Sequence, residues 1–168
     1  KIYKEQNMIY KTTKEILESL SPFISENDVS VTSEEHEKED GSGKEIGDKV
    51  IIDKENNVWF EVFENEIVLF YFTDHEHFDD YMAPPKDGEP NYIQRATNFL
   101  KRLFTLRLKK TETVKGSDML RVEYAFESSD GEDFLGGTWK MINDADSRRE
   151  VETTVWAFDG EKKRFARV

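Results

Sequence analysis

The chain has 168 residues, with 24 Lys and Arg against 36 Asp and Glu, and a formal net charge of −12 at pH 7. This length fits one domain whose core needs no disulfide or metal to hold it together. The absence of cysteine excludes disulfide frameworks, thiolate zinc sites, iron–sulfur clusters and cysteine nucleophiles. The longest apolar run, residues 67–72, is shorter than the roughly 18 residues of a membrane-spanning helix. We expect a single cytoplasmic domain over residues 1–168, without a cofactor or membrane segment.

The first half of the chain predicts a helix, a loop and a group of strands. Apolar residues recur at helical spacing over residues 9–20, and Pro22 ends this pattern because the residue before a proline avoids helical geometry. Residues 33–48 contain seven acids, two lysines and three glycines, which predicts an acidic mobile loop. Alternating or continuous apolar character then predicts strands over residues 49–53, 58–63 and 66–73.

The second half predicts one more helix followed by an antiparallel meander. Asn91 with Gln94 three residues later resembles a capping box and predicts a helix over residues 92–108. Residues 120–126 alternate between apolar and polar side chains, as in a strand with one buried face. We therefore expect an α+β fold in which a mostly antiparallel sheet of about six to eight strands packs with two helices.

The densest group of potential metal ligands lies in residues 74–80. On a strand, His75 and His77 would face the same side, and with Asp79 they could hold zinc or a similar ion. The alternative is a solvated helical turn that begins with Asp74 as its cap and leaves these side chains in water. We favour the turn, because two histidines two residues apart often occur by chance.

Charge is distributed unevenly along the chain. Residues 1–90 contain 23 acids and nine lysines, a net charge of −14, whereas residues 91–168 contain 13 acids and 15 bases, a net charge of +2. A strongly negative surface repels phosphate backbones and attracts basic proteins over long range. We therefore expect a basic protein partner and no direct binding of nucleic acid.

The expected interface combines charges that speed association with aromatic anchors that slow dissociation. The predicted steering charges are Glu34, Glu35, Glu37, Glu39 and Asp40; the predicted contact charges are Asp74, Glu76, Asp79 and Asp80; and the predicted anchors are Phe78 and Tyr81.

Two stretches give the chain a resemblance to a known group of proteins. Residues 66–81 (EIVLFYFTDHEHFDDY) and residues 92–104 (YIQRATNFLKRLF), in a small acidic chain, resemble the immunity proteins encoded beside bacterial polymorphic toxins. These stretches cover less than a fifth of the chain, and no residue's role is carried over from the family. The resemblance implies an inhibitor, and not an enzyme, that neutralises a basic, nuclease-like toxin by forming a stoichiometric complex.

A different class of function stays open. A small-molecule-binding or hydrolytic pocket could lie between a curved sheet and the second predicted helix. Gly136 and Gly137 would bend that sheet, and Tyr124, Trp139 and Trp156 would line the cavity. A metal-dependent hydrolase centred on His75 and His77 is a third hypothesis.

Overall fold

The chain divides into two compact units. The computed structural model describes residues 8–115, 118–139 and 149–168. The first unit comprises Lys1–Lys101 with Gly160–Arg164, and the second comprises Arg102–Asp159 with Phe165–Val168.

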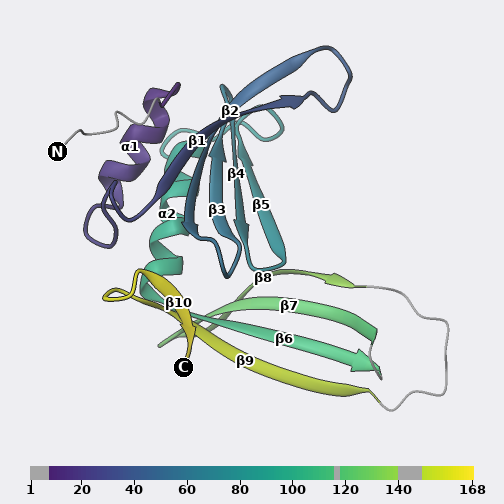
Figure 1. Ribbon diagram of the computed structural model, residues 1–168. Coiled ribbons are helices and arrows are strands. Elements are labelled where there is room, and N and C mark those ends of the chain that lie inside the picture. The colour runs from purple at the N-terminus through teal and green to yellow at the C-terminus, as the bar shows by residue number, and fades with distance from the viewer. Residues whose placement is uncertain (1–7, 116–117, 140–148) are drawn as a thin grey trace. The chain divides into compact units, whose positions relative to one another are not determined.

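A five-stranded antiparallel meander forms the centre of the first unit (Figure 1). Its strands pair in sequence order, from β1 at one edge to β5 at the other. Since residues paired across strands point to the same side, the registers separate two faces of this sheet. The strands are β1 (Ser30–Glu37), β2 (Lys44–Asp53), β3 (Val58–Val62), β4 (Glu66–Tyr71) and β5 (Asp74–Asp79).

Two helices, α1 (Lys11–Ser19) and α2 (Tyr92–Thr105), contact one face of this sheet, here called the helix face. Val50, Phe60 and Leu69 lie opposite one another on this face and are completely buried. The ring of Phe99 on α2 lies 5.5 Å from that of Tyr71 on the same face. The apolar core of the first unit therefore lies between the helices and the sheet.

Neither helix within the described ranges combines the length and apolarity needed to cross a membrane.

The N-terminus of α1 is capped by a side chain of β2 and not by its own sequence. Tyr10 occupies the cap position and makes no side-chain cap hydrogen bond. The carboxylate of Asp48, with no exposed surface, accepts hydrogen bonds from the backbone N–H groups of Ile9 and Tyr10 at 2.8–3.0 Å. It also accepts one from the hydroxyl of Thr13 at 2.7 Å. The free N–H groups and positive dipole end of the helix thus balance a buried negative charge.

Helix α2 begins as the sequence predicts and ends earlier. The N–H of Gln94 donates to Oδ1 of Asn91, and the N–H of Asn91 donates to Oε1 of Gln94, both at 2.9 Å. This reciprocal pair is a capping box. The helix ends at Thr105, three residues before the predicted end, because Arg107 already begins strand β6.

The second unit contains an antiparallel sheet with the order β10-β9-β6-β7-β8. On β7, Leu120, Val122, Tyr124 and Phe126 are buried, so the predicted alternation is confirmed. The pairing of β7 with β8 shifts between Tyr124 and Ala125, which is the irregularity expected beside Gly136. The strands are β6 (Arg107–Lys115), β7 (Asp118–Ser128), β8 (Gly131–Trp139), β9 (Glu150–Asp159) and β10 (Arg164–Arg167).

The α+β class and the two helices are confirmed. The number of strands is corrected: the structure has ten strands in two sheets, where the sequence predicts about six to eight. Residues 33–48, expected to be a mobile loop, form most of a β-hairpin in which Ser30 pairs with Ile51 and Glu37 with Lys44. Residues 74–79 form strand β5 and not a helical turn. In both segments a charged sequence obscured strands that are stabilised by pairing with the adjacent strand of a hairpin.

We predict that Asp48→Ala lowers the free energy of unfolding by about 3 kcal/mol, because it leaves the buried Thr13 hydroxyl and two part-buried N–H groups without their acceptor. Urea denaturation monitored by circular dichroism measures this loss. Asp40→Ala is the matched control: Asp40 also accepts a backbone N–H, from Ser42, but it is exposed, so little change is expected. Equal effects of the two substitutions would contradict the capping role of Asp48.

Candidate functional site

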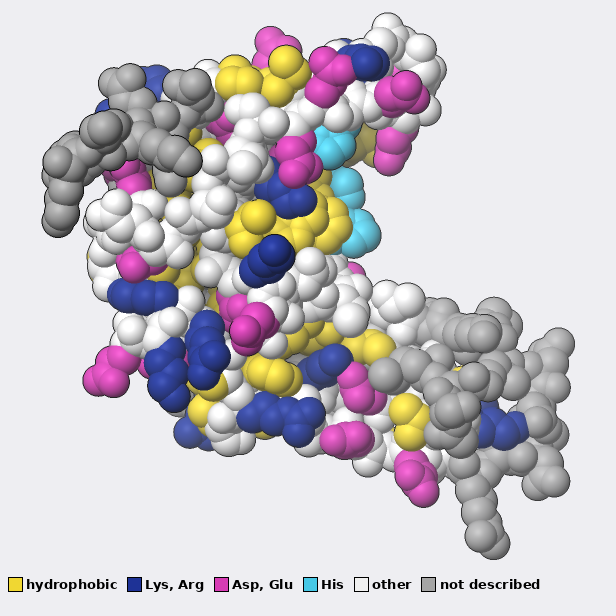
Figure 2. Space-filling view, in the orientation of Figure 1, with side chains coloured by type: hydrophobic (Ala, Val, Ile, Leu, Met, Phe, Trp, Pro, Cys, Tyr) yellow, Lys and Arg dark blue, Asp and Glu magenta, His cyan; other side chains and the backbone are white. Residues whose placement is uncertain are grey.

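The face of the first sheet opposite the helices, here called the opposite face, holds an unusual set of polar and aromatic side chains. One row across the strands contains Lys49, Glu61, Val68 and His77. Figure 2 shows histidine side chains beside hydrophobic ones on the visible surface. The neighbouring row contains Ile51, Trp59, Phe70 and His75.

Stacked rings cover part of the opposite face. The ring of Trp59 stacks on Phe70 with centroids 3.9 Å apart, and Phe70 stacks on His75 at 5.2 Å. Nζ of Lys49 lies 4.2 Å from the centroid of the Trp59 ring, which is a cation–π contact. Trp59 and Phe70 are half-buried and His75 is exposed, and their stacked rings form a continuous aromatic row across β3, β4 and β5.

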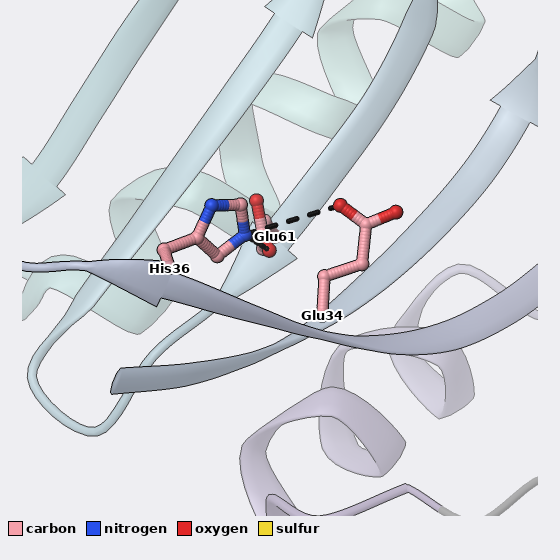
Figure 3. Close-up of side chains that lie close together, drawn as sticks. All are labelled: Glu34, His36 and Glu61. Carbon is pink, nitrogen blue, oxygen red and sulfur yellow. Dashed lines mark hydrogen bonds and ion pairs between the residues drawn. The ribbon is translucent and has the colours of Figure 1, made fainter. Parts of the chain in front are cut away.

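Beside this aromatic row, three ionisable side chains form what we call the carboxylate–histidine cluster: Glu34, His36 and Glu61. Nε2 of His36 lies 2.5 Å from Oε1 of Glu61 and 3.9 Å from Oε2 of Glu34. Figure 3 shows both contacts converging on the imidazole. Oε1 of Glu34 also lies 3.5 Å from Nζ of Lys49. The cluster thus combines two carboxylates and one imidazole within reach of a single ion or proton.

Gly47 makes room for this cluster. Glu34 and His36 project from β1 and Glu61 from β3, with β2 between them. Gly47 on β2 pairs with Glu34, and a Cβ at this position would lie 2.7 Å from Oε1 of Glu61 and 2.7 Å from Cε1 of Phe63. Because glycine has no side chain, the groups from β1 and β3 can meet across β2.

Glu61 is the buried member of the cluster. Its side chain is 5% exposed, against 39% for His36 and 41% for Glu34. Burial raises the pKa of the Glu61 carboxyl, and the hydrogen bond and charge of His36 oppose this effect. A carboxylate removed from water requires a cationic or hydrogen-bonding partner. In this structure His36 is that partner.

The sequence offers His75, His77 and Asp79 as possible metal ligands, although it favours a solvated turn, and all three lie on the opposite face of β5. Nδ1 of His77 lies 2.5 Å from Oε1 of Glu66, and the rings of His75 and His77 are 5.1 Å apart. Within the described residues, however, the group whose donor atoms all lie within 4.8 Å of one another is Glu34, His36 and Glu61. Among the described residues, the donor atoms therefore converge at Glu34, His36 and Glu61 and not at the alternative metal site on β5.

Among the predicted steering charges, Glu34 belongs to the carboxylate–histidine cluster, while Oε1 of Glu35 pairs with Nζ of Lys44 at 2.7 Å. Glu37, Glu39 and Asp40 are exposed at the end of the β1–β2 hairpin. Since β3 pairs only with residues from Asp48 onward, residues 34–47 form a two-stranded extension, here called the acidic ribbon. Figure 1 shows it projecting beyond the ends of β3, β4 and β5.

The predicted contact charges are divided between the two faces of β5. Asp74 and Glu76 share the helix face with Phe78, because β-strand side chains alternate. Asp79 lies on the opposite face, and Oδ1 of Asp80 forms an ion pair with Nη1 of Arg95 at 3.0 Å. These four acids therefore do not form one patch.

The two predicted anchors also differ in position. The ring of Phe78 is half-buried and lies 5.9 Å from that of Phe99 on α2, so it belongs to the core margin. Tyr81 is 64% exposed. The charges of Glu66 and Asp79, and more weakly those of Glu39 and Glu45, raise the pKa of the Tyr81 phenol. Tyr81 thus lies in a negative field produced jointly by the acidic ribbon and by strands β4 and β5.

A groove of about 670 Å³ lies between α1 and α2 in the first unit. Glu15, Ile93, Thr97 and Lys101 are among the residues that line it. The pocket hypothesised from the sequence involves other residues, in the second unit. There Tyr124 is buried, Nε1 of Trp156 donates to Oγ1 of Thr154 at 3.1 Å, and the side chain of Trp139 lies outside the described residues.

No protein-family model matches the chain, and no curated protein or solved structure is significantly similar to it. A function for this chain must therefore be inferred from the arrangement of its own residues.

Sequence reasoning missed His36 and Glu61. Glu34 and His36 have the period-two spacing of one strand face, and Gly47 is a glycine within a strand, but only the register across three strands connects them to Glu61.

We predict that Gly47→Ala lowers the free energy of unfolding by about 1–3 kcal/mol, because the added methyl group would overlap Glu61 and Phe63. Thermal and urea denaturation measure this loss. Gly160→Ala is the control, since a Cβ there meets no atom within 4 Å. Equal stability of the Gly47→Ala and wild-type proteins would show that Glu61 does not need the space above Gly47.

We also predict that Glu76 titrates above the ordinary glutamate pKa. Burial raises the pKa of its carboxyl, a hydrogen bond from the Tyr71 hydroxyl opposes this, and the charge of Asp74 adds to the increase. The folded state then binds the proton more tightly than the unfolded state does. Stability contributed by protonated Glu76 is therefore present at low pH and lost as pH rises through the elevated pKa.

Titration of the glutamate carboxyl carbons by ¹³C NMR tests this prediction. Asp74→Asn lowers the pKa of Glu76 towards the ordinary value, because it removes the neighbouring negative charge. Glu76→Gln removes the corresponding pH dependence of unfolding. A Glu76 midpoint at or below the ordinary glutamate value would contradict the assignment.

Proposed function

We propose that this protein binds a basic protein stoichiometrically and inhibits it, as an immunity protein that neutralises a nuclease-like toxin. The observation that carries the proposal is the exposed Tyr81 in a negative field to which both the acidic ribbon and β4–β5 contribute. An exposed aromatic side chain in the field of several carboxylates is suited to contact a cationic protein surface. The exposed ends of the ribbon supply the long-range attraction.

The acidic ribbon is suited to this role by its position and charge. Residues 34–47 contain six acids and two lysines, and their strands pair only with each other. Glu35, Glu37, Glu39 and Asp40 are exposed and thus accessible to a partner. A nuclease carries a positive surface because it must attract phosphate, so complementary charge would accelerate association with the ribbon.

Binding kinetics with the protein encoded beside this one in its native genome test the proposal. The triple substitution Glu37→Lys, Glu39→Lys and Asp40→Lys is expected to slow association at least about tenfold at low salt, with a smaller effect at high salt. The control triple Glu18→Lys, Glu26→Lys and Glu55→Lys reverses the same number of exposed charges outside the ribbon. It is expected to change the association rate much less.

Tyr81→Ala is expected to increase the dissociation rate about tenfold, as loss of an interfacial aromatic anchor does. Nuclease activity of the partner, measured against increasing amounts of this protein, should reach zero at one equivalent. Equal effects of the two charge-reversal triples would refute the assigned surface. A neighbouring protein that binds but has no nuclease activity would refute the toxin class.

A further inference from the structure

We propose that the carboxylate–histidine cluster is a binding site for a divalent transition-metal ion of the Zn²⁺ class. The ligands would be Nε2 of His36 and one carboxylate oxygen each from Glu34 and Glu61. This inference goes beyond the proposed inhibition and does not depend on it. An imidazole and two carboxylates are N and O donors of the types that zinc and manganese accept, with further coordination positions left for water.

The donor atoms already converge. All three lie within 4.8 Å of one another, and Nε2 of His36 is 2.5 Å from Glu61 and 3.9 Å from Glu34. Ligands about 2.0–2.1 Å from a tetrahedral ion are separated from each other by about 3.3–3.4 Å. The first distance would therefore lengthen and the second shorten by less than an ångström, which side-chain rotations of Glu34 and His36 can provide.

The backbone around the cluster is arranged to bring these ligands together. Glu34 and His36 lie two residues apart on one strand face, so both side chains point to the same side. Glu61 reaches them from β3 across Gly47, where any side chain would occupy the same space. The ring of Phe63 packs edge-on against His36, with centroids 5.7 Å apart. Phe63 thereby restricts the orientation of the imidazole.

Burial and charge favour a cation at this position. The Glu61 side chain is 95% buried and points into the cluster, where its charge is poorly solvated. In the structure, His36 and Lys49 are the basic groups closest to the two carboxylates. A divalent ion would balance both carboxylates at once. Lys49 would compete with that ion for Glu34.

Competition by Lys49 provides a test in which one substitution strengthens binding. Lys49→Met removes a positive charge from beside the site and releases Glu34, so it is expected to increase affinity for Zn²⁺ severalfold. His36→Ala and Glu61→Gln each remove a ligand and are expected to reduce affinity at least tenfold. The double variant His75→Ala, His77→Ala removes the other histidines of the opposite face and is expected to change affinity less than twofold.

Isothermal titration calorimetry of the tag-free full chain with ZnCl₂ at neutral pH measures the affinity for Zn²⁺ and the stoichiometry. We expect one ion per chain. Visible absorption of Co²⁺ added to the wild-type protein reports ligation independently of any variant. Circular dichroism and thermal denaturation of each metal-free variant identify those that fail to fold. If a ligand variant fails to fold, Glu34→Gln is used in its place, because Glu34 is more exposed than Glu61.

Four outcomes would overturn the proposal of a metal site. These are no binding of Zn²⁺ and no Co²⁺ spectrum, binding that survives both ligand substitutions, binding abolished by the His75 and His77 double variant, and weaker binding in Lys49→Met. In the first case, the cluster would be a hydrogen-bonded acid–imidazole pair only.

Discussion

The buried carboxylate of Asp48 connects helix α1 to the β1–β2 hairpin. It holds the first turn of α1 against β2 through two backbone N–H groups and the hydroxyl of Thr13, and Oγ of Ser33 on β1 lies 3.4 Å away. A charge with no exposed surface is tolerated only where donors surround it. The position of α1 and the beginning of the β1–β2 hairpin therefore depend on one another.

The same strand, β2, separates two different environments. On the helix face its side chains alternate into the core at Asp48, Val50 and Ile52. On the opposite face Gly47 and Lys49 border the carboxylate–histidine cluster. A rigid, helix-backed sheet is a suitable support for a ligand set, because its strand spacing fixes where side chains from β1 and β3 can meet. Glu34 and His36 of the acidic ribbon belong to this supported part, and residues 37–44 lie beyond it.

Local patterns predicted the parts of the fold that depend on local physics. The capping box at Asn91 and Gln94, the alternation along β7 and the irregular pairing near Gly136 all follow from a few neighbouring residues. Strands β1 and β5 were missed because their sequences are rich in charge, and their stability comes from pairing in hairpins with β2 and β4. The cluster around Glu61 was missed for the same reason: its three members are brought together by register, and no spacing along the chain encodes it.

Gly47 also has a consequence for how this sequence can change over generations. A side chain at position 47 and the acidic group at position 61 compete for the same volume, so neither position can vary without regard to the other. In an alignment of homologues, these two columns should covary. Sequences that acquire a larger residue at position 47 should carry a shorter or uncharged one at position 61, and such lineages would have lost the arrangement of Glu34 and His36 around it.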